Sequence, residues 1–140
     1  MHILIVDDHR EFAQTLATLL VESSTVPLTV DIGFDGVQAV QLALCHPPAV
    51  AFLDIEMPRT NGADAAMAIR DALSGRAPLM VAVTGNPDLL TAAALTGLFN
   101  WTLCKPIQPE DLLAVIGAAA ATLQPPTVQQ VVGGSSTAPV

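Results

Sequence analysis

The sequence predicts an α/β fold in which a parallel sheet of five strands is covered on both faces by helices. Short apolar runs rich in Val, Ile and Leu, as expected for strands buried on both faces, recur along the chain. A longer segment of helical period follows each run, and this alternation builds a parallel sheet. The 140 residues, of which 51% are hydrophobic, are enough for one globular domain with a real core.

Five strand and helix units can be placed in order. The expected strands lie near 2–7, 28–33, 49–53, 79–84 and 100–104. The expected helices lie near 10–22, 36–45, 62–73, 87–98 and 109–122. Turn and capping residues support several helix starts, namely Asp35-Gly36, Asn61-Gly62, Asn86-Pro87-Asp88 and Pro109-Glu110-Asp111. The folded domain is therefore expected to cover 1–123, and the Pro, Gly and Ser content of 124–140 predicts a disordered tail or linker.

The charge of the chain excludes two classes of partner. Thirteen acidic residues against five basic ones give a net charge of −8, which repels nucleic acid backbones and anionic membrane surfaces. The apolar stretch that begins at His2 lacks a basic n-region and is too short for a signal peptide. The weakly polar run 112–123 falls short of the roughly 20 residues that cross a bilayer. We therefore expect a cytoplasmic protein that binds neither nucleic acid nor membrane.

Motifs for two common functions of α/β sheets are missing. The sequence holds no G-x-G-x-x-G loop and no G-x-x-x-x-G-K-[ST] loop, so the dinucleotide and P-loop nucleotide sites lack their phosphate cradle. Cys45 and Cys104 lie far apart and have no metal-ligand spacing. We expect both to be buried free thiols.

Polar side chains close the apolar runs of several predicted strands. The chain has a single lysine, Lys105, and it follows the fifth run. Because the strands of a parallel sheet point the same way, residues that close different strands meet at one edge, where open α/β folds bind ligands. An acidic residue after a strand is often only a cap, and a lysine is usually a solvated charge. Five such residues at one edge favour a site, and they are Asp7, Asp8, Asp54, Thr84 and Lys105.

These residue types suit phosphoryl chemistry. Clustered carboxylates repel one another unless a cation keeps them ionised, and Mg²⁺ prefers such oxygen ligands. The backbone carbonyl of Glu56, two residues after Asp54, could add a further oxygen. A carboxylate can also act as the nucleophile and form an acyl phosphate. The metal, Lys105 and the Thr84 hydroxyl would then meet the three phosphoryl oxygens in the transition state.

The same residues resemble the receiver domain of two-component response regulators over roughly 2–122. The ordered set of motifs carries the resemblance, and it consists of Ile3-Leu4-Ile5-Val6-Asp7-Asp8, Leu53-Asp54-Ile55-Glu56-Met57-Pro58-Arg59-Thr60-Asn61-Gly62, Val83-Thr84-Gly85 and Leu103-Cys104-Lys105-Pro106-Ile107. The resemblance implies a flavodoxin-like doubly wound (βα)5 sandwich with strand order 2-1-3-4-5. It also implies that Asp54 is the phosphoacceptor and that Mg²⁺ binds Asp7, Asp8, Asp54 and the Glu56 carbonyl. Thr84 and Lys105 would contact the phosphoryl group.

Further positions match or depart from the pattern of receivers. Gly85 stands where receivers carry a small residue, which would leave the acyl phosphate open to a partner histidine or water. Pro106 would form the family's cis peptide bond, although trans is the default from sequence alone. Thr102 replaces the switching aromatic residue of many receivers. Trp101 could take over that role, face a partner or pack in the fold. Glu56 occupies a position that modulates the lifetime of the phosphoryl group in receivers.

The resemblance implies a signalling phosphoacceptor rather than a dedicated enzyme. A sensor histidine kinase or histidine phosphotransfer domain would donate the phosphoryl group, and hydrolysis would be slow. A downstream protein would bind the surface formed by the fourth helix, fifth strand and fifth helix, and the conformation of this surface would depend on phosphorylation. A homodimer could form through the same surface. Two alternatives remain at this point: a receiver-like interaction module that works without phosphorylation, and an aspartyl-phosphate-forming phosphatase of the haloacid dehalogenase-like kind.

Overall fold

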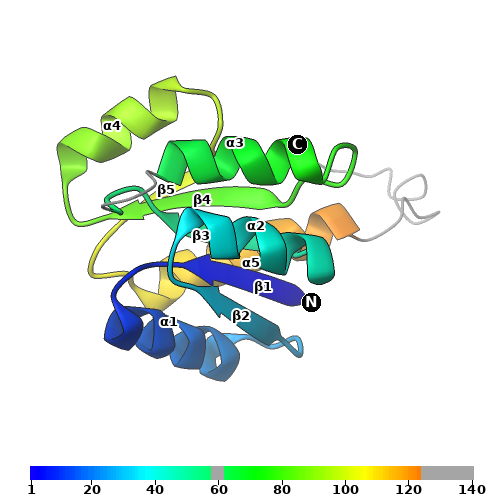
Figure 1. The fold of residues 1–140 in the computed structure, drawn as a ribbon. Helices are drawn as coiled ribbons and strands as arrows, with labels where there is room; N and C mark the ends of the chain where they lie inside the picture. Colours follow the sequence, from blue (N-terminus) through cyan, green and yellow to red (C-terminus); the bar gives the residue numbers. More distant parts are fainter. Residues whose placement is uncertain (58–61, 124–140) are drawn as a thin grey trace, which may run out of the picture.

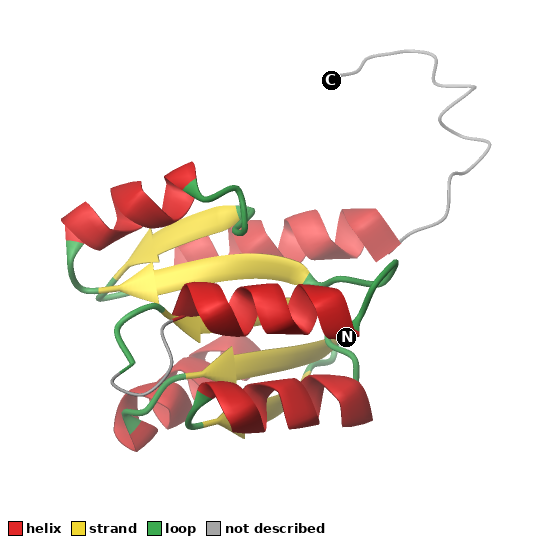
Figure 2. Ribbon diagram, turned by 45° about the horizontal axis from the view of Figure 1, so that its top comes forward, coloured by secondary structure: helices red, strands yellow, loops and turns green. Residues whose placement is uncertain are grey.

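The protein folds around a single parallel sheet. The structure is a computed structural model that describes residues 1–57 and 62–123, so the expected tail at 124–140 lies outside the described residues. The sheet is ordered β2-β1-β3-β4-β5, which confirms the predicted fold class and strand order. Figure 2 shows the strands pointing the same way. The strands are β1 (His2–Val6), β2 (Thr29–Gly33), β3 (Val50–Asp54), β4 (Leu79–Thr84) and β5 (Trp101–Cys104).

Helices cover both faces of the sheet. They are α1 (Arg10–Ser23), α2 (Gly36–Cys45), α3 (Gly62–Ala72), α4 (Pro87–Leu95) and α5 (Pro109–Leu123). Figure 1 shows α1 and α5 on one side, with α2, α3 and α4 on the other. Each side has its own apolar core: Leu16 and Leu112 belong to the first, Ala39 and Ile69 to the second. None of the described helices is long and apolar enough to span a membrane.

The burial of each strand follows from its place in the sheet. All five residues of β3 are buried, because this strand has a neighbour on each side and helices on both faces. In β2, at the edge, the sequence Thr-Val-Asp-Ile-Gly includes polar residues, and only Gly33 is fully buried. The continuous apolar runs of the sequence therefore mark the inner strands most clearly.

Most predicted helix boundaries lie within one residue of the observed ones, but α4 ends three residues earlier than expected. The helix stops at Leu95, because the Thr96 hydroxyl donates to the carbonyl of Ala93 at 2.7 Å and Gly97 takes a φ of +73°. Glycine adopts this left-handed conformation without the steric penalty of other residues, and it commonly ends helices.

The prediction that both cysteines are buried is wrong. Cys45 and Cys104 are free thiols, but both are exposed. Cys45 is the last residue of α2, and Cys104 is the last residue of the edge strand β5, so neither residue has neighbouring elements on every side. Composition suggested burial because cysteine is on average among the most buried residues, but position in the fold decides it.

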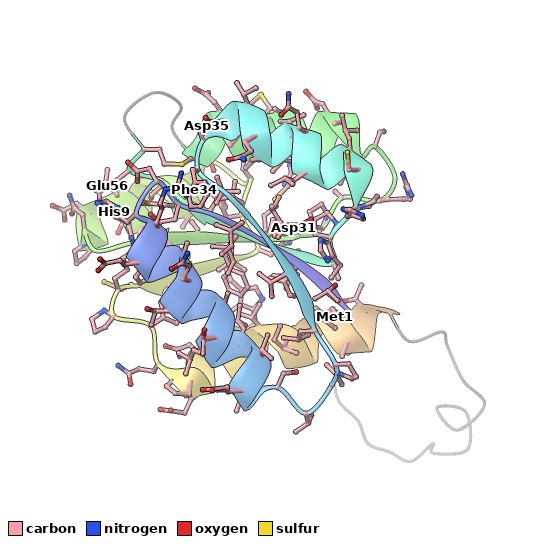
Figure 3. The ribbon with its side chains drawn as sticks, turned by 60° about the horizontal axis from the view of Figure 1, so that its bottom comes forward. Met1, His9, Asp31, Phe34, Asp35 and Glu56 are labelled. Carbon is pink, nitrogen blue, oxygen red and sulfur yellow. The ribbon has the colours of Figure 1, made fainter. Side chains whose placement is uncertain are left out.

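The strand order reverses between β1 and β3. The chain leaves β1 toward β2 on one side, and β3 lies on the other side of β1. Open α/β folds bind ligands at the carboxyl ends of the strands where the order reverses in this way. Figure 3 labels His9 and Glu56 at this end of the molecule and Met1 at the opposite end.

Candidate functional site

The carboxyl ends of four strands bring together four of the residues that the sequence singled out. Asp7 follows β1, Asp54 ends β3, Thr84 ends β4 and Lys105 follows β5. Backbone hydrogen bonds extend the ladder to this edge: the Asp7 N–H donates to the carbonyl of Gly33 at 3.0 Å, and the Lys105 N–H donates to that of Thr84 at 2.9 Å. The sheet therefore fixes the backbone of the site.

The acidic residues form one tight cluster. One ligand atom from each of Asp7, Asp8, His9 and Asp54 lies within 4.8 Å of the others. Asp7 and Asp54 are only 2% and 3% exposed, so water screens their charges weakly. The Lys105 ammonium is 3.1 Å from Asp7 Oδ2 and 3.6 Å from Asp54 Oδ2. One cation thus contacts two of the three carboxylates, and the cluster keeps a net negative charge.

The surroundings of Asp54 disfavour its ionised form. Burial raises the pKa of Asp54 above its ordinary value, and the nearby Asp7 carboxylate raises it further. Two contacts oppose this rise. The Glu56 N–H donates to Asp54 Oδ1 at 2.9 Å, and the Lys105 ammonium attracts the carboxylate. The net effect is a raised pKa, so the protein holds this carboxylate at a cost in stability.

The donor set fits a hard divalent cation. Asp8 Oδ1 is buried and has no hydrogen-bond partner within the described part of the chain. His9 Nδ1 lies 3.2 Å from that oxygen, but the geometry is not that of a hydrogen bond. A buried carboxylate oxygen without a partner, beside two more carboxylates, is an arrangement that a bound cation would satisfy. Glu56 adjoins the cluster, since its N–H already contacts Asp54.

Thr84 is fully buried, and its hydroxyl is engaged on both sides. It donates to Glu56 Oε1 and accepts from the N–H of Asn86 at 3.1 Å. The next residue, Gly85, has open space around it, because a Cβ built there would meet no heavy atom within 4 Å. The hydroxyl is therefore held in place, while the approach beside it stays open.

Lys105 is held by an aromatic ring as well as by carboxylates. Its Nζ lies 4.1 Å from the centre of the Phe12 ring, on α1. An ammonium over an aromatic face is attracted by the ring quadrupole, so Phe12 helps to fix the lysine. The Lys105–Pro106 peptide bond is cis, as the resemblance to receivers implied.

The tryptophan of β5 packs in the fold. Trp101 is partly buried and lies against the apolar core shared by α1 and α5. Of the three interpretations left open by the sequence, the structure thus supports packing, and Thr102 beside it is also half-buried.

Sequence reasoning missed several residues around the site. The prediction for Glu56 concerned its carbonyl and a modulating role, and gave no contact between its carboxylate and Thr84. His9 joins the acidic cluster, and its place directly after Asp7-Asp8 could have revealed it. Phe12 gave no signal, because its contact with Lys105 spans most of the chain. Gly62 was predicted as a helix start, but its close approach to Asp54 was not: a Cβ there would lie 2.8 Å from the Asp54 carbonyl oxygen.

Known proteins are similar to this chain in sequence and in fold. The sequence profile of the response regulator receiver domain matches residues 3–117. The transcriptional regulatory protein PdtaR of Mycobacterium tuberculosis is 34% identical over 118 residues, which cover 84% of this chain and 55% of that protein. The nitrate/nitrite response regulator NarL of Escherichia coli is 32% identical over 120 residues, with 85% and 54% covered. The chain thus spans about half the length of these relatives.

A solved structure agrees with the sequence comparisons. The CheY-like receiver domain of a response regulator from Methylobacillus flagellatus superposes with a TM-score of 0.76 at 25% identity, and the match covers 85% of this chain and 98% of that one. The matched profile spans nearly all of the described fold, including the four strand ends that build the site. This chain belongs to the family of response regulator receiver domains.

Proposed function

We propose that this chain is a phosphoacceptor that takes a phosphoryl group from a phosphohistidine onto Asp54. Response regulator receiver domains are signalling modules that interact with histidine kinases and effector domains. The observation that carries the proposal is the buried Asp54 carboxylate, placed within 4.8 Å of two further carboxylates and 3.6 Å from the only lysine of the chain. The donor would be a sensor histidine kinase or a histidine phosphotransfer domain.

The transfer is a displacement at phosphorus. An oxygen of the Asp54 carboxylate attacks the phosphorus atom as the P–N bond to the donor imidazole breaks, and the electron pair of that bond leaves with the imidazole nitrogen. Lys105 and the Thr84 hydroxyl contact phosphoryl oxygens, so this chain contributes mainly positioning and charge stabilisation. Water later attacks the same phosphorus and releases phosphate, which returns Asp54 to its carboxylate form.

A Mg²⁺ ion is the proposed cofactor. Its ligands from this chain would be Asp7, Asp8, Asp54 and the backbone carbonyl of Glu56, all of them oxygen donors. When bound, the ion neutralises charge on the carboxylates and on the phosphoryl oxygens. The buried Asp8 oxygen, which has no hydrogen-bond partner among the described residues, supports this assignment, because a cation would satisfy it.

The signal would leave through the surface formed by α4, β5 and α5. Within α4 only Ala93 is buried, and Leu95 is 84% exposed, so an apolar surface is available for a downstream protein or a second copy. The net charge of −8 argues against nucleic acid and anionic membranes as partners of this chain. We further propose that residues 1–123 form the receiver domain, that 124–140 form a tail or linker, and that the protein acts in the cytoplasm.

The proposal is tested by the mass of the intact protein after incubation with acetyl phosphate and Mg²⁺. The wild type should gain one phosphoryl group, and Asp54→Asn should gain none. An adduct that persists in Asp54→Asn would show that another residue is the acceptor. No adduct in either protein, together with no labelling by a phosphorylated histidine phosphotransfer domain, would favour an interaction module that works without phosphorylation. Turnover of small phosphate monoesters would instead point to a phosphatase.

A further inference from the structure

The hydroxyl of Thr84 is already occupied in the unphosphorylated protein. It has a single proton, and it donates that proton to Glu56 Oε1. Its oxygen accepts from the Asn86 N–H, and the residue is fully buried, so the side chain sits in a fixed environment. A hydroxyl can donate to only one strong acceptor at a time. Any phosphoryl oxygen that is to receive this proton must therefore displace the Glu56 carboxylate.

We infer that the Glu56 carboxylate holds the Thr84 hydroxyl in place of a phosphoryl oxygen and thereby opposes the phosphorylated conformation. This inference deepens the proposed function and rests on it. The Glu56 side chain acts here as a positioning group, because its carboxylate bonds to Thr84 rather than to the reacting atoms. The equilibrium between the unphosphorylated and phosphorylated conformations then depends on the Glu56 carboxylate, which competes with the phosphoryl group for the Thr84 proton.

The backbone of Glu56 couples the two halves of the site. Its N–H donates to Asp54 Oδ1 at 2.9 Å, while its side chain accepts from Thr84. The neighbouring Ile55 N–H donates to the carbonyl of Val83 at 3.2 Å, which fixes this loop against the end of β4. One residue thus contacts the acceptor carboxylate through its backbone and the switching hydroxyl through its side chain.

The carboxylate can leave at little structural cost. Glu56 is exposed, so its side chain can turn into water without burying a charge or opening a cavity. What is lost is a hydrogen bond to a charged acceptor. Bonds of this kind change an equilibrium by about tenfold or more when they are removed.

Simple repulsion is the competing explanation, because a fourth carboxylate near the cluster also disfavours an incoming anion. Two substitutions separate the effects. Glu56→Gln removes the charge and keeps an acceptor oxygen of similar reach, whereas Glu56→Met removes both. Glu11→Gln, at an exposed position in the first turn of α1, removes one negative charge, leaves the bond between Glu56 and Thr84 intact, and serves as the matched control.

The experiment measures the affinity of beryllofluoride, a phosphoryl mimic that is not hydrolysed, in the presence of Mg²⁺ by titration calorimetry. Glu56→Met should bind about tenfold more tightly than the wild type, and Glu56→Gln should gain clearly less. Glu11→Gln should match the wild type. In the background Thr84→Val, which lacks the hydroxyl, the difference between the Met and Gln variants should vanish.

A second readout reports the hydroxyl directly. The methyl resonance of Thr84 in the free protein should move toward its beryllofluoride-bound position in Glu56→Met and stay near the wild-type position in Glu56→Gln. Equal affinities of the Met and Gln variants, or a difference that survives in Thr84→Val, would overturn the inference and leave the proposed function intact. A wild type that neither binds beryllofluoride nor gains mass with acetyl phosphate would overturn both.

Discussion

Replacing Asp54 by asparagine should stabilise the metal-free protein. At an effective dielectric constant of 20, two unit charges 4.8 Å apart, the largest separation in the cluster, interact by at least about 3 kcal/mol, and charges 3.6 Å apart by about 4 to 5 kcal/mol. The first energy applies to the repulsion of Asp54 by Asp7, and the partly exposed Asp8 repels Asp54 less strongly. The second energy applies to the attraction of Asp54 by Lys105. The repulsion from Asp7 raises the pKa of Asp54 more than the attraction to Lys105 lowers it, and burial raises it most of all, so we expect a gain of about 2 kcal/mol in total.

The assay is urea unfolding followed by the fluorescence of Trp101, the only tryptophan of the chain, in buffer with EDTA. With the usual urea dependence of a small domain, a gain of about 2 kcal/mol moves the midpoint up by about 1 M. Adding Mg²⁺ should stabilise the wild type more than Asp54→Asn, because the ion binds the carboxylate in the folded state.

The pH dependence of stability independently tests whether Asp54→Asn stabilises the protein. Because the pKa of Asp54 is raised by folding, the native state keeps its proton to a higher pH than the unfolded chain. Wild-type stability should therefore fall as pH rises from the unfolded pKa through the folded one, and the advantage of Asp54→Asn should appear over that window and persist above it. If Asp54→Asn is less stable than the wild type without metal, or if its advantage is the same at acidic and neutral pH, the charge argument is wrong.

Three further predictions concern packing and cation–π contacts around the fold. Gly62→Ala should lower the free energy of unfolding by about 1 to 3 kcal/mol, because its Cβ would overlap the backbone at Asp54. Gly117 lies inside α5 with open space around it, so Gly117→Ala should instead raise the free energy of unfolding by about 0.5 to 1 kcal/mol. Urea titrations of both variants measure these opposite changes in stability. A double-mutant cycle of Phe12→Leu and Lys105→Met should give a favourable coupling of about 0.5 to 2 kcal/mol, and additive effects would rule out the cation–π contact.

The sequence was most informative where a local signal determines the structure. Strands could be placed because continuous apolar runs end abruptly in a polar side chain, as at Asp54 and Thr84. The order of the strands came only from the resemblance to receivers, because no local pattern specifies which strands become neighbours. The early end of α4 depended on Thr96 and Gly97, whose capping role becomes clear only from their conformation.

Contacts between distant residues could not be predicted from the sequence. The Glu56 and Thr84 side chains are 28 positions apart, and they meet because β3 and β4 pair in one register. The close approach of Gly62 to Asp54 depends in the same way on how α3 starts beside β3. Sequence therefore identified which residues close the strands, whereas the structure was needed to identify what each side chain touches.

In the proposed function, the charge balance of the site would let it act as a switch. The three carboxylates of Asp7, Asp8 and Asp54 and the one ammonium of Lys105 carry a net charge of −2, and two of the carboxylates are almost fully buried. In the proposed function a divalent cation brings this sum to zero, and converting the Asp54 carboxylate to its phosphoryl form then adds about one negative charge. That charge develops beside Thr84, whose proton is held by Glu56. The response that costs least free energy is for the Thr84 hydroxyl to donate to a phosphoryl oxygen instead of Glu56, because the released Glu56 carboxylate can move into water. A pocket that is unbalanced without its cation, next to a hydroxyl with a replaceable partner, can convert a small change of charge into a change of conformation.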